Sequence, residues 1–248
     1  MSFVVFLFIG FAAQMVDGCL GMAYGVLSTT FLVAIGLPPA TASASIHFAE
    51  MFTTATSAAS HLKFGNVDKK LFKSLVVPGV LGGIFGACAL SELDASRIRP
   101  FVNIYLLILG MYIISKGLQK IKVKRVANNV KPLGFIGGMF DAIGGGGWGP
   151  IVTTTLVAVG NSPRKTVGTV NTVEFFVTLA QSATFFLCLG SCAQYAKIIA
   201  GLLVGGVIAA PLSAIVCRKI NSKAMTILVG VLVVLTNVYA LSRCFVGT

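Results

Sequence analysis

The sequence has few charged residues for its length. Only 10% of its 248 residues are Asp, Glu, Lys or Arg, whereas typical soluble proteins carry about 25%. The chain therefore has too few charged residues to cover the surface of a soluble protein. Hydrophobic residues make up 56% of the chain, and the mean hydropathy is +0.93. Several apolar stretches, such as 40–60, 166–190 and 195–217, match or exceed the roughly 20 residues that cross a bilayer as a helix. The sequence predicts an all-α polytopic protein whose main partner is the lipid bilayer.

Acidic residues are scarcer than basic ones, with 7 Asp and Glu against 19 Lys and Arg and a net charge of +12. The basic residues gather in short connections between apolar stretches, chiefly 63–73 and 116–131. Such clusters orient membrane proteins. Nucleic-acid binding would need a basic domain interleaved with aromatic residues, which this sequence lacks. We therefore expect no nucleic-acid partner.

The sequence also lacks the motifs of metal and nucleotide sites. Its six cysteines form no CxxC pair and have no His–Cys metal spacing. The glycine run GGGGWGP does not continue into the GK[ST] ending of a P-loop. We therefore expect no metal, no cofactor and no enzymatic activity.

An internal repeat organises the chain. When the sequence is shifted by 124 residues, 10–61 and 134–185 align without a gap, and 17 of 52 positions are identical. The identities include the pairs Asp17/Asp141 and Glu50/Glu174. Duplicated halves with breaks at corresponding places are typical of secondary transporters. The predicted organisation is an N-terminal repeat (1–118), a basic cytoplasmic linker (119–132) and a C-terminal repeat (133–248).

Each half contains a glycine-rich interruption, VDGCLGMAYGV at 16–26 and FDAIGGGGWGP at 140–150. One helix over residues 1–36 would be roughly 54 Å long, but the apolar core of a bilayer is about 30 Å thick. We therefore predict that each half is a broken, re-entrant helical hairpin followed by three transmembrane helices. Three crossings per half make the repeats inverted in topology. This arrangement places fifteen of the nineteen Lys and Arg residues on one side, so we predict a multi-pass plasma-membrane protein with both termini extracytoplasmic.

Two glutamates lie deep in apolar stretches. Glu50 and Glu174 each follow about ten residues of a predicted helix, where a carboxylate costs roughly 2.5–3.5 kcal/mol on insertion scales. Two roles remain open for these glutamates and for Asp17 and Asp141. They couple transport to protons, or they support the hairpins by accepting hydrogen bonds from free backbone N–H groups.

The restarted half-helices, near Val26 and Pro150, point their N-termini at the membrane centre. Free N–H groups and the positive end of the helix dipole make an anion site there. Two facing tips would hold one small oxyanion between them. The predicted substrate-binding residues are Tyr24, Thr29, Thr30, His47, Gly145, Gly146, Trp148, Thr153, Thr154 and Asn171.

Two segments, GFIGGMFDAIGGGGWGPIVTTTLVAVGNSPRKTVGTVN and GMAYGVLSTTFLVAIGLPPATASASIHFAE, resemble the glycine-rich hallmark segments of the TauE/SafE sulfite exporter family. The resemblance covers both halves. It implies export of sulfite or of a small organosulfonate such as sulfoacetate. A similar branch takes up thiosulfate but relies on cysteines in its central loops, where this chain has only Cys19.

Other functions remain open as alternatives. A passive anion channel would share the same architecture, and proton-gradient dependence of the flux would separate the two. An intramembrane aspartyl protease using Asp17 and Asp141 is a remote alternative, because such a dyad needs two carboxyls close enough to share a proton. The sequence also leaves open whether the protein forms a homodimer.

Overall fold

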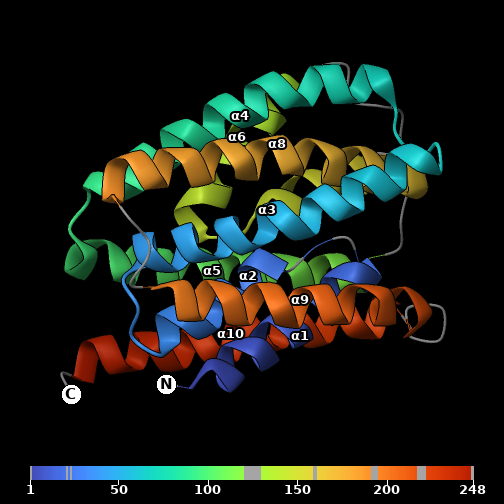
Figure 1. The fold of residues 1–248 in the computed structure, drawn as a ribbon. Coiled ribbons are helices and arrows are strands. Elements are labelled where there is room, and N and C mark those ends of the chain that lie inside the picture. The colour runs from blue at the N-terminus through green and yellow to red at the C-terminus, as the bar shows by residue number, and fades with distance from the viewer. Residues whose placement is uncertain are drawn as a thin grey trace.

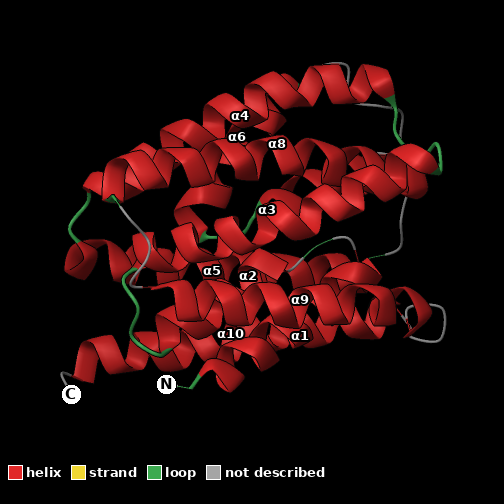
Figure 2. Ribbon diagram, viewed as in Figure 1, coloured by secondary structure: helices red, strands yellow, loops and turns green. Residues whose placement is uncertain are grey.

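The described part of the chain is entirely helical. The computed structural model describes residues 2–20, 22, 24–119, 130–158, 161–190, 195–216 and 222–246, and these residues form helices and no strand (Figure 2). The predicted helical class is confirmed. The elements are α1 (Phe3–Leu20), α2 (Tyr24–Ala34), α3 (Pro39–Lys63), α4 (Lys69–Glu92), α5 (Ala95–Leu118), α6 (Lys131–Gly144), the π-helix η1 (Gly149–Thr153), α7 (Thr154–Ala158), α8 (Pro163–Leu189), α9 (Ala196–Val216) and α10 (Ser222–Val246).

Most helices run along a common direction, as in a bundle (Figure 1). α1 begins and α10 ends at the same end of this bundle, whereas the connection between α3 and α4 lies at the opposite end. α3 and α8 pack together and run in opposite directions, and the same holds for α5 and α10. Each of these pairs joins two helices whose residues correspond in the 124-residue repeat.

The chain breaks where the two glycine-rich interruptions predict it. In the first half, α1 ends at Leu20 and α2 begins at Tyr24, and these two helices pack against one another. In the second half, α6 ends at Gly144 and η1 begins at Gly149. Between them, Gly145 has a φ of 62° and Gly146 a φ of 152°, values that a residue with a side chain rarely adopts. Both helices are therefore broken.

Each broken helix packs against a helix of the other half. α1 lies along α9, and α6 lies along α4. Small residues allow this close approach. A Cβ atom on Gly205 of α9 would lie 2.0 Å from the Leu7 carbonyl oxygen of α1, and one on Gly82 of α4 would lie 2.0 Å from the Phe135 carbonyl oxygen of α6. The two halves are therefore interleaved in one bundle.

Three helical segments of the described chain are long and apolar enough to cross a membrane, namely Lys69–Glu92, Pro100–Leu118 and Lys165–Leu189. α3 is equally long but is rich in serine and threonine, and its Ser43, Ser45 and His47 are 0% exposed. A helix at the centre of a bundle contacts protein on most sides, so its polar residues find protein partners instead of lipid. This central position explains why α3 is less apolar than the outer helices.

Candidate functional site

The two helix breaks meet at the centre of the molecule. A Cβ atom on Gly25 would lie 2.7 Å from the Gly146 Cα, and a Cβ on Gly146 would lie 2.2 Å from the Val26 nitrogen. The Thr29 hydroxyl of α2 also donates a hydrogen bond to the Gly145 carbonyl. We call 17–25 the first tip and 141–149 the second tip. Only glycine allows their backbones to come this close.

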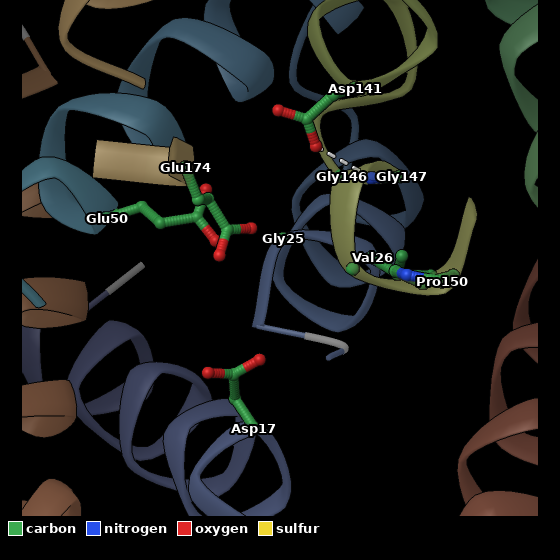
Figure 3. Close-up of a pocket in the computed structure, with 10 residues that line it drawn as sticks. Asp17, Gly25, Val26, Glu50, Asp141, Gly146, Gly147, Pro150 and Glu174 are labelled. Carbon is green, nitrogen blue, oxygen red and sulfur yellow. Dashed lines mark hydrogen bonds between the residues drawn. The ribbon is translucent and has the colours of Figure 1, made fainter. Parts of the chain in front are cut away.

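A small cavity lies between the tips (Figure 3). Four carboxylic acids, each from a different helix, take part in its lining: Asp17 from α1, Glu50 from α3, Asp141 from α6 and Glu174 from α8. We call these four residues the carboxyl cluster. The remaining lining comes from the tips and the residues directly after them, namely Gly25, Val26, Gly146, Gly147, Gly149 and Pro150. The structure thus brings all four predicted acidic residues to one place.

The size and charge of this cavity bear on what it can hold. Its volume open to the centre of a water molecule is 10 Å³, about enough for one water. A sulfur oxyanion is larger, so it fits only if the tips separate. The lining contains no lysine or arginine, and ionised carboxylates would repel an anion at this short range. The cavity in this state is therefore too small for a sulfur oxyanion, and each ionised carboxylate in its lining opposes the binding of one.

Asp141 holds the second tip in shape. Its Oδ1 accepts hydrogen bonds from the backbone N–H groups of Gly147 at 2.8 Å and Trp148 at 2.9 Å, and its Oδ2 accepts from Gln181 Nε2 at 3.0 Å. The Asp141 carboxylate thus occupies N–H groups at the start of the second half-helix, where an external anion could otherwise bind. In the first tip, Asp17 Oδ1 accepts from the Tyr24 N–H at 3.4 Å.

His47 connects the first half to the second tip. Its Nδ1 lies 3.3 Å from Glu50 Oε2 and 3.9 Å from Asp141 Oδ2, and its Nε2 lies 3.3 Å from the Asp141 carbonyl oxygen. The imidazole is 0% exposed and stacks on Phe185, with ring centroids 6.3 Å apart. A protonated imidazole in this place would balance part of the negative charge of Glu50 and Asp141.

Asn171 takes the place of His47 in the second half, and its contacts differ. Its Nδ2 donates to the Ser57 hydroxyl at 3.1 Å and not to a carboxylate. Within the part of the chain that the structure describes, the Glu174 carboxyl has no hydrogen-bond or ion-pair partner and faces the cavity (Figure 3). The two equivalent glutamates therefore have different surroundings.

The predicted aromatic residues do not line the cavity. Tyr24 and Trp148 are 1% and 0% exposed. The Tyr24 hydroxyl donates to the Leu202 carbonyl at 3.1 Å, and Trp148 Nε1 donates to the Val170 carbonyl at 3.2 Å. Both side chains pack behind their tips.

The predicted threonines are buried in the half-helices beside the tips. Asn237 Nδ2 donates to the Thr30 hydroxyl at 3.4 Å, and the Thr154 hydroxyl donates to the Pro150 carbonyl. The Thr153 hydroxyl is buried without a hydrogen-bond partner among the described residues.

Sequence reasoning missed two anchoring side chains. The Ser43 hydroxyl donates to the Ala142 carbonyl at 2.6 Å, and Gln181 bonds to Asp141 as described above. The spacing could have identified them: Ser43 lies four residues before His47 and seven before Glu50 on one helix face, and Gln181 lies seven residues after Glu174. The lining residues Gly25, Gly147 and Gly149 were also missed individually, although the sequence predicted a site near Val26 and Pro150, and both of these residues line the cavity.

Two expectations concern parts that the structure describes only partly or not at all. The side chain of Cys19 and most of the 119–132 linker lie outside the described residues. Among the residues that were searched, no group of His, Cys, Asp and Glu side chains is arranged to hold a metal ion.

Long apolar helices and two broken helices that meet at a buried polar cavity define the class of the protein, a multi-pass membrane transporter. The comparisons agree. The family model described as "Sulfite exporter TauE/SafE" matches residues 6–240. The chain is 46% identical over 242 residues to the "Probable membrane transporter protein YtnM" of Bacillus subtilis (strain 168), covering 94% of this chain and 81% of that protein. The chain therefore belongs to the TauE/SafE family. No solved structure matches it.

Proposed function

We propose that this protein is a secondary transporter that exports a small sulfur-containing anion, either sulfite or an organosulfonate such as sulfoacetate, across the plasma membrane. One observation carries the proposal: the two helix breaks meet tip to tip at a buried polar cavity. Paired half-helix ends at the centre of a repeat protein are the usual place of a transporter's substrate site. The anion class comes from the family to which the chain belongs.

The anion binds at the first tip after the two tips separate. The first residues of α2, including Gly25 and Val26, have N–H groups with no intrahelical acceptor, and both residues line the cavity. At the second tip Asp141 accepts from the N–H groups of Gly147 and Trp148, and the residue that corresponds to Val26 is Pro150, which has no N–H to offer. The first tip therefore offers the freer donors, with the positive end of the α2 dipole behind them.

Anion binding beside the carboxyl cluster requires protons. Four ionised carboxylates around one small cavity would repel a sulfite or sulfonate group, and protonation removes this repulsion and turns the carboxyl into a hydrogen-bond donor. Proton binding and anion binding therefore favour one another at this site. The membrane potential, negative inside, favours exit of each negative charge that is not accompanied by a proton, by about 2.3 kcal/mol per 100 mV.

Flux measurements in proteoliposomes test this function. We expect the purified protein to move sulfite or sulfoacetate but not chloride, with a rate that depends on the pH gradient. Flux that ignores the pH gradient and passes chloride would identify a channel. Accumulation of thiosulfate would indicate an uptake permease, and no flux of any sulfur anion would contradict the proposal.

The inverted arrangement of the two halves is part of the same proposal. Opposite directions of α3 and α8 support it (Figure 1), as does the excess of basic residues in the connections at one end. Both termini then face the outside of the cell, and each broken helix enters and leaves the membrane on one side.

Cysteine labelling tests this topology in a background without the six native cysteines. Ser2→Cys and Ile35→Cys flank the first broken helix, and both should react from outside the cell. Lys131→Cys and Ser162→Cys flank the second, and both should react only from the cytoplasm. Labelling of one pair from opposite sides would show that this broken helix crosses the membrane.

A further inference from the structure

We infer that Glu174, and not its repeat partner Glu50, is the carboxyl that gains and loses the proton when the anion binds. This inference rests on the proposed anion transport and assigns its proton linkage to one residue. It follows from a single difference between the two halves, the replacement of a histidine by an asparagine beside the carboxyl cluster.

The two glutamates occupy equivalent positions with unequal partners. Three residues before Glu50 stands His47, whose Nδ1 lies 3.3 Å from Glu50 Oε2. Three residues before Glu174 stands Asn171, whose side-chain amide bonds to Ser57 Oγ at 3.1 Å. Glu50 therefore has a basic partner within contact distance, and among the described residues Glu174 has none.

The partner of Glu50 stays with it in any state of the transporter. His47 and Glu50 lie one turn apart on α3, so separation of the tips does not pull them apart. A carboxylate held by a protonated imidazole keeps its charge, because its partner compensates the loss of hydration. Glu50 therefore stays ionised when the cavity opens.

The surroundings of Glu174 change as the cavity opens. In the closed cavity it faces the three other members of the carboxyl cluster, Asp17 from α1, Glu50 from α3 and Asp141 from α6, and no lysine or arginine lines the space. An unpaired carboxylate beside other carboxylates and out of bulk water is disfavoured, so the neutral acid is the stable form. Water that enters between separated tips can hydrate the carboxylate and accept its proton.

The arrangement assigns a simple cycle to this carboxyl. Water in the open cavity delivers a proton to a Glu174 carboxylate oxygen, and the neutral acid then tolerates, or donates a hydrogen bond to, the bound anion. Release of the anion on the other side lets the proton return to water there. In each transfer one O–H bond breaks as another forms: the hydronium ion gives its proton to the carboxylate on loading, and the acid gives it to water on release.

Calorimetry on the purified full-length protein tests the assignment. Methanesulfonate serves as the probe, because its charge does not change over the working pH range, and sulfite is measured in parallel. Titration in buffers of different ionisation enthalpy gives the number of protons taken up per bound anion. At pH values where Glu174 is ionised in the anion-free protein, one proton is taken up with each anion, so affinity for methanesulfonate should rise about tenfold per unit fall in pH. The wild-type protein should show this slope, and Glu174→Gln should lose it.

Three matched variants sharpen the test, each checked for folding by size-exclusion chromatography. Glu50→Gln should retain the wild-type proton uptake per bound anion. Asn171→His gives Glu174 the partner that Glu50 has, and should reduce the uptake. His47→Asn removes the partner of Glu50 without touching Glu174, and should raise the uptake toward about two protons, with a correspondingly steeper slope.

The outcomes separate the inference from the proposed function. Failure of the wild-type protein to bind any of these anions overturns both. Anion binding by the wild type with an unchanged pH slope in Glu174→Gln, or with the slope lost in Glu50→Gln, overturns the inference alone. If Glu174→Gln does not fold, the two remaining variants decide the question. Proton uptake per bound anion should fall in Asn171→His and rise in His47→Asn, and a change in the same direction in both variants overturns the inference.

Discussion

The two hairpin tips derive from one duplicated sequence, yet the protein holds them differently. At the second tip, the Thr29 and Ser43 hydroxyls donate to the carbonyls of Gly145 and Ala142, and His47 contacts the Asp141 carbonyl. All three side chains come from the first half.

The positions that correspond to these donors are Thr153, Val167 and Asn171. The Thr153 hydroxyl is buried without a partner among the described residues, and the Asn171 amide bonds to Ser57. Valine at 167 has no polar side-chain atom. None of these side chains holds the first tip in the described structure.

This difference shows how a duplicated protein can divide its tasks. Anchors from the first half fix the second tip, and Asp141 accepts hydrogen bonds from the N–H groups of Gly147 and Trp148 there. The first tip has the Val26 N–H where the second has Pro150, which has no N–H, and Glu174 has no basic partner among the described residues. We therefore expect substrate and proton to bind on the less restrained side of a nearly symmetric site.

Removal of the two aspartates should have the largest and most unequal effects. Asp141→Ala deletes three hydrogen bonds to a buried carboxylate, each worth about 1.5–3 kcal/mol. We expect this variant to unfold or to lose at least about 4 kcal/mol of stability. Asp17→Ala loses the longer bond to the Tyr24 N–H and should lose about half as much or less. Apparent melting temperatures in detergent measure the stability of both variants. Equal losses of stability would show that the two aspartates hold their tips equally strongly.

Alanine substitution at glycine separates crowding at the tips from backbone strain. Gly146→Ala puts a Cβ atom 2.2 Å from the Val26 nitrogen at a φ of 152°, and should destabilise the protein by about 2–4 kcal/mol. Gly36→Ala is the matched control, with a φ of 100° and no atom within 4 Å of the added Cβ. It should cost about 1 kcal/mol. Equal melting temperatures for the two variants would mean that the tips do not touch.

Paired threonine variants should give the smallest effect and the cleanest comparison. Thr29→Val keeps the side-chain shape but removes the donor to the buried Gly145 carbonyl, and should cost about 1–2 kcal/mol. Thr153→Val, at the equivalent position, removes a buried hydroxyl that has no partner in the described structure. It should leave the stability unchanged or raise it slightly. A larger loss in Thr153→Val than in Thr29→Val would reverse the assignment of the anchored tip.

Much of this arrangement follows from sequence because it rests on local chemistry. Runs of apolar residues determine the helices, and glycine with aspartate marks where two of them break. Glu50 and Glu174 stand out because placing a carboxylate in an apolar helix costs free energy. The repeat predicts two facing tips, and the structure adds that all four members of the carboxyl cluster line the cavity between them.

The rest depends on contacts between the halves, which no local pattern shows. His47 reaches the Asp141 carbonyl and Ser43 the Ala142 carbonyl across 94 and 99 residues. Tyr24 and Trp148 stand beside glycines in the tips, which suggested contact with substrate. The Tyr24 hydroxyl and Trp148 Nε1 instead donate to the carbonyls of Leu202 and Val170 in the packed interior. Only the packing of the two halves decides which side of a tip faces the cavity.

The most direct test of the central claim, that the anion binds between the tips, is to locate a bound anion. Selenite carries the charge and shape of sulfite and contains an anomalous scatterer. In crystals of the transport-competent protein grown at acidic pH with selenite, we predict a selenium peak beside the N–H groups of Gly25 and Val26, roughly 3–4 Å from their nitrogens. A single strong selenium peak elsewhere in the membrane region, with the space between the tips still closed, would contradict the account.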